Sequence, residues 1–137
     1  MEKVDLALKV QEMFASGKID FSFLDEAFSR ASKYFSGTSP GKINRYDNGV
    51  KSVSIEGLTD GISPTFGYLP EGDFEFNTGK NQETMHYLLG DLSWCVKGEG
   101  LVVPEQYDIL VIPAGKELVL NVKSPSLYLC DYLKQLD

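Results

Sequence analysis

Apolar residues recur at helical spacing in the first part of the chain and give way to short strand-like runs in the rest. Over residues 4–14 the apolar positions predict an amphipathic helix that stops near Gly17. Asp20 or Ser22 is positioned to cap a second helix, which we expect to end before Gly37. The apolar stripes of these two helices are Leu6, Val10, Met13 and Phe14, and Phe21, Leu24, Phe28 and Ala31.

The remainder of the chain alternates short apolar runs with Gly, Pro, Asn and Asp about every ten residues, which is typical of an all-β protein. No helical stripe separates the runs, so we expect antiparallel strands in a jelly roll or closed barrel. The segment SGTSPG at 36–41 predicts a linker between a helical N-terminal extension, residues 1–41, and a barrel, residues 42–137. The expected strands are 50–55, 64–69, 72–77, 84–89, 92–97, 109–112, 117–122 and 127–132.

Composition and charge narrow the classes of function. The 137 residues, 42% of them hydrophobic, fit one folded domain. A net charge of -7 repels a phosphate backbone, so we expect no nucleic-acid partner. No run approaches the length of a membrane span and the start lacks the apolar core of a signal peptide, so we expect no membrane partner. The two cysteines, Cys95 and Cys130, lie in apolar runs, which favours core positions in a reduced, cytoplasmic protein.

Two stretches, residues 70–90 and 108–122, have the spacing of the paired motifs of cupin barrels. In metal-binding cupins these motifs supply three imidazoles and one carboxylate. Here the carboxylate is Glu83, but the only histidine, His86, is out of phase with it and is expected on the other face of its strand. The imidazole positions fall at or near Phe76, Thr78 and Leu118. We therefore expect a cupin-type antiparallel barrel with no metal site and no cofactor.

Three motifs narrow the resemblance from cupin barrels in general to one family. The runs GYLPEGDFEFNTGKNQETMHYLLGDL, VIPAGKELVLNV and SLYLCDYL resemble, in this order, the single-domain cupin family of pyrimidine/purine nucleoside phosphorylases. The similarity covers roughly residues 48–133. It implies a homodimeric, metal-independent pentosyltransferase that splits purine and pyrimidine ribonucleosides with inorganic phosphate into free base and ribose 1-phosphate. One departure is Asp131, where members of the family often carry Arg.

The candidate catalytic residue is Glu83. Inside a barrel its carboxylate would accept hydrogen bonds from the ribose hydroxyls and stabilise positive charge at the anomeric carbon in the transition state. The alternative is a solvated carboxylate at the strand entrance. Strand alternation from an inward Glu83 also places Met85, Tyr87 and Leu89 inside the barrel.

Other candidates would bind the substrates. Thr78 would hydrogen-bond a sugar hydroxyl or a phosphate oxygen, with simple β-branched packing as the alternative. Lys116 and Lys80 are the cations nearest the motifs and are weak candidates for phosphate, with solvent-facing charges as the alternative. Aromatic rings that would stack on the base, or only fill the barrel, are Phe76, Tyr68, Tyr87, Tyr128 and Tyr132.

A second function stays open at this point: a non-catalytic cupin that binds a small molecule or has a regulatory role. The Asp131 departure, the scarcity of cations near the motifs and the helical extension favour it. The length and order of the family resemblance favour the enzyme. The apolar stripes of the extension indicate that it packs on the barrel or within a dimer, because exposed phenylalanines would be a liability.

Overall fold

The first helix begins and ends close to the predicted positions, and the second begins where a cap was predicted. The computed structural model describes residues 2–58 and 62–133. Helix α1, Lys3–Ser16, ends at Gly17, whose left-handed backbone (φ 78°) lets its N–H reach the carbonyl of Met13. Helix α2, Phe21–Ala27, is capped by Asp20, whose Oδ1 accepts a hydrogen bond from the Phe23 N–H at 3.1 Å.

The second predicted helix is broken into pieces. Phe28 leaves the helical conformation (φ -125°, ψ 69°) and is followed by a 3-10 turn, η1 Ser29–Ala31, and a short helix, α3 Ser32–Phe35. The break follows from packing, because the Phe28 side chain is completely buried and its ring lies 6.4 Å from that of Phe66 on the sheet. Tertiary contact overrides the helical period here.

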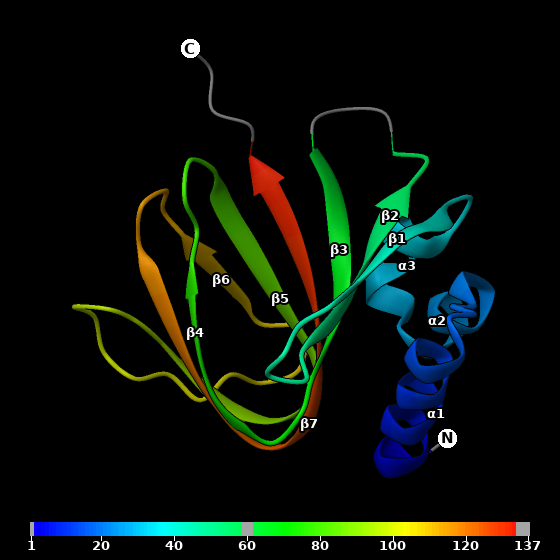
Figure 1. Cartoon of the computed structure of the whole chain (residues 1–137), viewed down its shortest axis with the longest axis horizontal. Coiled ribbons are helices and arrows are strands. Elements are labelled where there is room, and N and C mark those ends of the chain that lie inside the picture. Colours follow the sequence, from blue (N-terminus) through cyan, green and yellow to red (C-terminus); the bar gives the residue numbers. More distant parts are fainter. Residues whose placement is uncertain (1, 59–61, 134–137) are drawn as a thin grey trace.

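The rest of the described chain forms one antiparallel sheet that curls round on itself (Figure 1). Its order is β1-β2-β3-β7-β5-β6, and β4 pairs with the free side of the first half of β7. All pairs are antiparallel, which confirms the predicted all-β class with a helical N-terminal segment. The strands are β1 Ser39–Arg45, β2 Lys51–Glu56, β3 Ile62–Leu69, β4 Gly72–Asn77, β5 Gln82–Val96, β6 Ile109–Ile112 and β7 Glu117–Leu133.

Two strands are longer than predicted, because each expected pair of runs is one bent strand. The bend in β5 lies at Gly90, where the backbone has φ 127° and a Cβ atom would lie 2.0 Å from Oγ of Ser126 on β7. Only glycine permits this approach. The pairing of β5 with β7 shifts register on both sides of Leu89, so strict alternation fails there. Leu89 consequently packs with the helices and not inside the barrel as predicted.

The predicted linker is in part a strand. Residues 39–41 begin β1, which pairs with β2. Arg45 at the end of β1 donates a hydrogen bond at 2.5 Å from Nη2 to the carbonyl of Phe14, in the last turn of α1. A guanidinium at that position satisfies a carbonyl that the helix leaves free and complements the negative end of its dipole. The extension and the sheet are thus joined directly.

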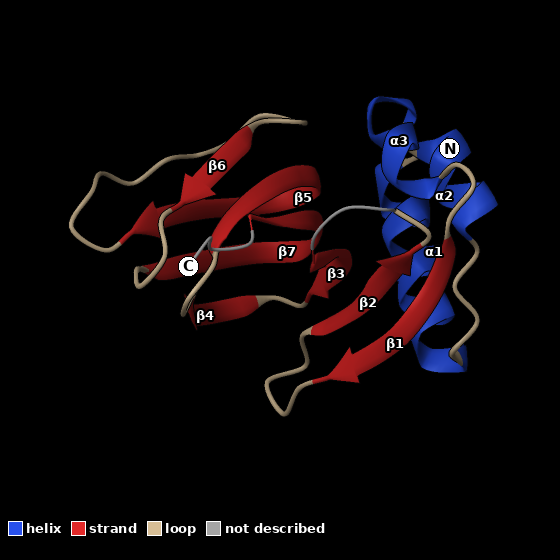
Figure 2. Cartoon of the chain, turned by 90° about the horizontal axis from the view of Figure 1, so that it is seen from above, coloured by secondary structure: helices blue, strands red, loops and turns tan. Residues whose placement is uncertain are grey.

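The helices cover one face of the sheet and leave the hollow of the barrel on the other (Figure 2). Alternation along the strands supplies two separate cores. Val53 and Ile55 of β2 and Phe66 of β3 face the helices, as do Leu127 and Leu129 of β7. The residues that fill the barrel from the other face include Leu69, Phe74, Met85, Trp94, Ile112, Leu118, Leu120, Tyr128 and Cys130.

The residues between 2 and 58 and between 62 and 133 contain no helix long and apolar enough to cross a membrane.

Candidate functional site

A cavity of about 560 Å³ lies in the hollow of the barrel. Strands β1, β2, β3, β4, β5 and β7 all contribute side chains to its wall. Because it is the largest hollow among those found in the described chain and combines apolar rings with convergent polar groups, it is the candidate functional site. The lining residues are Asn44, Tyr46, Asn48, Val50, Ser52, Ile62, Ser63, Thr65, Glu75, Phe76, Asn77, Glu83, Met85, Leu118, Tyr128, Cys130 and Tyr132.

Glu83 is in this wall, near the start of β5, opposite Tyr132 of β7 and Ile112 of β6. Its carboxylate makes no hydrogen bond and no ion pair within the described ranges, 2–58 and 62–133. Burial raises the pKa of this carboxyl to about 7, because nearby apolar side chains replace the water that would solvate its charge. Glu83 therefore exchanges its proton near neutral pH and has free lone pairs for a ligand.

Three aromatic side chains from β4 and β7 line the cavity: Tyr128, Tyr132 and Phe76. The Tyr128 ring lies against the backbone of β3 opposite Gly67, where a Cβ atom would lie 2.1 Å from Cζ of the ring. The hydroxyl of Tyr132 is 3.0 Å from Oγ1 of Thr65. Burial is the first cause that raises the pKa of Tyr128 and of Tyr132, so both phenols are neutral.

Next to these rings is a polar wall that the sequence analysis missed. It comprises Asn44 of β1, Tyr46 and Asn48 of the β1–β2 turn, Ser52 of β2 and Thr65 of β3. Asn44 donates a hydrogen bond from Nδ2 to Oγ of Ser52 at 3.3 Å. The sequence did contain a signal: KSVSIE alternates, and once helices cover Val53 and Ile55, the serines must face inwards.

Two of the predicted stacking residues do not line the cavity. Tyr68 faces the helices and belongs to their core, because it has the same parity as Phe66 on β3. Tyr87 is inside the barrel, but its hydroxyl donates a hydrogen bond at 2.5 Å to the carbonyl of Gly90 and its ring meets the Trp94 ring edge-on. Both expectations are corrected: Tyr68 supports the helices, and Tyr87 holds the bend in β5.

Thr78 also lies outside the cavity lining. Its hydroxyl donates a hydrogen bond to the carbonyl of Pro113 at 2.8 Å and accepts one from the Lys116 N–H at 3.2 Å. These bonds tie the turn after β4 to the turn before β7. The observed role of Thr78 is therefore structural, which is closer to the packing alternative than to substrate binding.

The two predicted phosphate lysines lie on these same turns. Lys80 and Lys116 are exposed to solvent, and neither contributes to the cavity wall. Among the described lining residues none is Lys or Arg. A ligand in the cavity would therefore meet hydroxyls, amides and carboxylates.

Asp131, the departure from the family pattern, faces away from the cavity. It pairs with Thr84 on the outer side of the sheet and accepts a hydrogen bond from the hydroxyl of Tyr34 on α3. A change of residue at this position therefore alters the contact between helix and barrel and leaves the cavity lining as it is.

The donor set of the cavity does not match a cupin metal site. Glu83, Phe76 and Leu118 line the cavity at three of the motif positions, and the last two carry no ligand atom. Over residues 2–58 and 62–133, no group of three His, Cys, Asp or Glu side chains is arranged to hold a metal ion.

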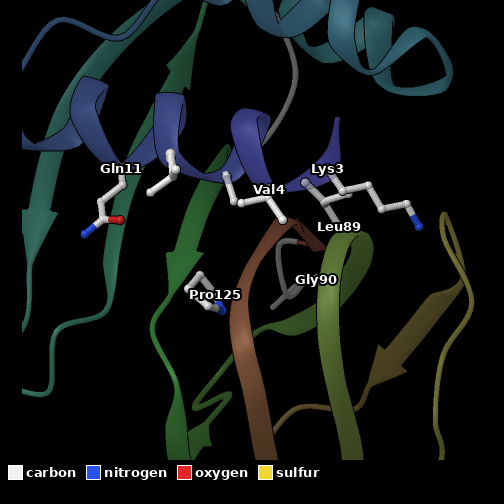
Figure 3. A pocket seen from close by; sticks show the side chains of 8 residues that line it. Lys3, Val4, Gln11, Leu89, Gly90 and Pro125 are labelled. Carbon is white, nitrogen blue, oxygen red and sulfur yellow. The ribbon is translucent and has the colours of Figure 1, made fainter. Parts of the chain in front are cut away.

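A smaller groove of about 160 Å³ lies between α1 and the bends of β5 and β7 (Figure 3). Val4, Leu8, Leu89 and Pro125 make its wall mainly apolar, with Lys3 as its charged residue. Apolar side chains with one exposed ammonium supply neither an acid nor a base for chemistry near neutral pH. The barrel cavity remains the candidate site.

Comparison with known proteins points to the same region of the chain. Residues 41–132 match the family model described as pyrimidine/purine nucleoside phosphorylase. A protein of that name from Pseudomonas putida is 37% identical over 95 residues, which cover 66% of this chain and 96% of the relative. Another from Pelobacter propionicus is 32% identical over 97 residues, covering 68% and 89%. Helices α1, α2 and α3 precede the matched residues.

Solved structures show the same fold. A protein of unknown function from Vibrio parahaemolyticus, 28% identical, superposes with a TM-score of 0.60 over 69% of this chain and 99% of that one. A cupin domain from Schizosaccharomyces pombe, 13% identical, superposes with a TM-score of 0.54 over 69% of each chain. The barrel is therefore of the cupin type, as predicted.

Proposed function

The chain belongs to the pyrimidine/purine nucleoside phosphorylase family, and from this premise we propose that it splits purine and pyrimidine ribonucleosides with inorganic phosphate in the barrel cavity. The products would be the free base and ribose 1-phosphate, which makes the protein a pentosyltransferase. One observation carries the proposal: the unpaired carboxylate of Glu83 lines one cavity together with aromatic rings and neutral polar side chains.

Glu83 is the proposed catalytic residue. Cleavage of the glycosidic bond leaves positive charge on the anomeric carbon, and a carboxylate without a partner cation stabilises that charge more than one already neutralised. Because its pKa is raised to about 7, roughly half of the molecules carry the charged form at neutral pH. The ionised form accepts hydrogen bonds from the ribose hydroxyls, so binding of the sugar itself favours the active state.

The aromatic and the polar lining residues suit the two parts of a nucleoside. Tyr128, Tyr132 and Phe76 offer ring faces to a base, and stacking depends little on whether that base is a purine or a pyrimidine. Asn44 and Ser52 in the polar wall offer groups that both donate and accept hydrogen bonds. A sugar with several hydroxyls requires donors and acceptors together.

Phosphate would be bound by neutral donors in this chain. The side chains of Asn44, Tyr46 and Thr65 are available in the polar wall, and the absence of Lys and Arg from the described lining makes binding weaker than at a cationic site. The proposed reaction proceeds without a metal, because the free carboxylate and these donors already supply charge stabilisation and positioning.

That same absence of cations favours a second candidate: a cupin that binds a neutral polar small molecule without catalysis or with a regulatory role. The cavity, the stacking rings and Glu83 would then serve recognition alone. Dependence on phosphate separates the two candidates.

The test is release of free base from a panel of purine and pyrimidine ribonucleosides, with and without phosphate, in the presence of EDTA. We expect release that requires phosphate, survives EDTA and is lost in Glu83→Gln, with Glu99→Gln as the matched control on an exposed turn. Saturable nucleoside binding without release in the folded protein would establish the second candidate. Release that persists in Glu83→Gln would contradict the catalytic role of Glu83.

We further propose a homodimer in a reduced, cytoplasmic setting. Strand β6 is at the edge of the sheet and exposes Val111, and its free backbone groups would pair with a second copy of the chain. Both cysteines are free thiols. Light scattering of the wild type and of Val111→Lys tests the assembly: a monomeric wild type contradicts the proposal, and dissociation of the variant supports it.

A further inference from the structure

Another hollow, of about 290 Å³, lies on the outer side of the barrel between the helices and β5–β6. We name it the helix–sheet pocket. It is separate from the barrel cavity and shares no lining residue with it. Much of it is formed by the extension, which precedes the matched family region. Its lining residues are Arg30, Ala31, Lys33, Tyr34, His86, Leu88, Tyr107 and Ile109.

The floor of this pocket holds a chain of hydrogen bonds. The Tyr34 hydroxyl donates its only proton to Asp131 of β7. His86 Nε2, 3.3 Å from the same hydroxyl, must then be the donor in their contact. Neutral His86 therefore carries its proton on Nε2 and leaves Nδ1 as an acceptor. Asp131 accepts this hydrogen bond but is not among the residues that line the pocket.

Two cations stand at the opening. Arg30 and Lys33 are exposed, and neither forms an ion pair within the described part of the chain. The Arg30 guanidinium lies 5.3 Å from the centre of the Tyr107 ring, and the Lys33 ammonium lies 4.9 Å from that of Tyr34. Burial lowers the pKa of His86, Asp131 opposes this effect, and Lys33 adds a smaller lowering effect.

Tyr107 is fixed in place. Its backbone has φ 70°, a left-handed conformation that is costly for a residue with a bulky side chain. The conformation is stabilised by a hydrogen bond at 2.7 Å from its N–H to the carbonyl of Tyr87. This strained conformation places the Tyr107 ring at the mouth of the pocket, beside Arg30.

We propose that the helix–sheet pocket binds a small organic anion, with its acid group at Arg30 and Lys33 and its apolar or aromatic part against Leu88, Ile109 and Tyr107. Two unpaired cations in a chain of net charge -7 attract an anion locally although the protein as a whole repels it. A guanidinium binds carboxylate and phosphate monoester in the same bidentate way, so the two share this chemistry. The proposal does not depend on the activity of the barrel cavity.

The single histidine of the chain makes the test direct, because its ring protons are assigned without ambiguity. The probes are phenyl phosphate, benzoate and, as the uncharged comparison, phenol, each titrated while the His86 resonance is followed by NMR. We expect saturable shifts with one or both anions and none with phenol. The anion that acts at lower concentration identifies the acid group.

Variants test the location. Loss of the charged hydrogen bonds in Arg30→Gln/Lys33→Gln should weaken binding about tenfold or more. Lys18→Gln/Lys123→Gln, which removes two exposed positive charges elsewhere, is the control for net charge and should retain wild-type affinity. Because the substituted side chains are exposed, the variants should fold. The proposal is overturned if no anion moves the resonance, if phenol acts equally, or if the double variant binds as well as the wild type.

Discussion

Replacing Glu83 by Gln should stabilise the protein at alkaline pH and leave it almost unchanged at acid pH. In the unfolded chain the carboxyl has its ordinary pKa of 4.5, whereas burial raises it to about 7 in the fold. The folded state thus holds the proton more tightly, and ionisation of Glu83 destabilises it. The penalty is absent below pH 4.5, grows as the pH rises and is complete above about 7.

The magnitude follows from the two pKa values. Each tenfold change in the ionisation constant corresponds to about 1.4 kcal/mol, so the full difference is about 3 kcal/mol. Because Glu83 is only half-buried, water screens part of this cost, and we expect Glu83→Gln to gain about 1–2 kcal/mol at pH 8.5. In a domain of this size that raises the melting temperature by about 3–8 °C.

The assay is urea and thermal unfolding of wild type, Glu83→Gln and the exposed control Glu99→Gln at pH 5 and pH 8.5. The expected pattern is a gain for Glu83→Gln that is about four times larger at pH 8.5 than at pH 5, with the control unchanged at both. An equal gain at both pH values, or a loss at pH 8.5, would refute the reasoning, because ionisation of Glu83 would then not destabilise the folded state.

Three further outcomes are expected. Phosphate-dependent nucleoside cleavage should rise with pH through about 7 in kcat/KM as Glu83 ionises; a flat profile from pH 5 to 9 would contradict this. Gly67→Ala should lower the free energy of unfolding by about 1–3 kcal/mol, because the new methyl group overlaps the Tyr128 ring, whereas Gly100→Ala, with open space around it, should be neutral in urea unfolding. Tyr34→Phe should cost about 1.5–3 kcal/mol by leaving a carboxylate without its donor, and an unchanged unfolding midpoint would refute the contact.

The spacing of apolar residues and the positions of turn residues were enough to predict the class of fold, the first helix and most strand positions. They failed where a strand bends without ending. Gly90 and Pro125 are typical turn residues, yet they lie at the bends of continuous strands, because β5 and β7 remain paired on both sides. Sequence alone does not distinguish a bend between two paired strands from a turn that joins them.

The candidate site was predicted in part. Glu83, predicted from the spacing of the cupin motifs, lines the cavity, as do the predicted rings of Phe76, Tyr128 and Tyr132. The polar wall on β1 and β2 was missed because its inward direction depends on the helices that cover the other face, and Tyr68 was misplaced for the same reason. Which face of a strand is inside depends on its tertiary neighbours.

Strand β7 belongs to both cores: Leu127 and Leu129 pack under the helices, while Tyr128 and Cys130 fill the barrel. Neither core is complete until this strand, the last in the chain order of the described residues, has been added to the sheet. Helices formed early in synthesis must wait for partners about a hundred residues downstream, which is a topology that slows folding. We therefore expect helices and barrel to gain and lose their structure together, in one cooperative step.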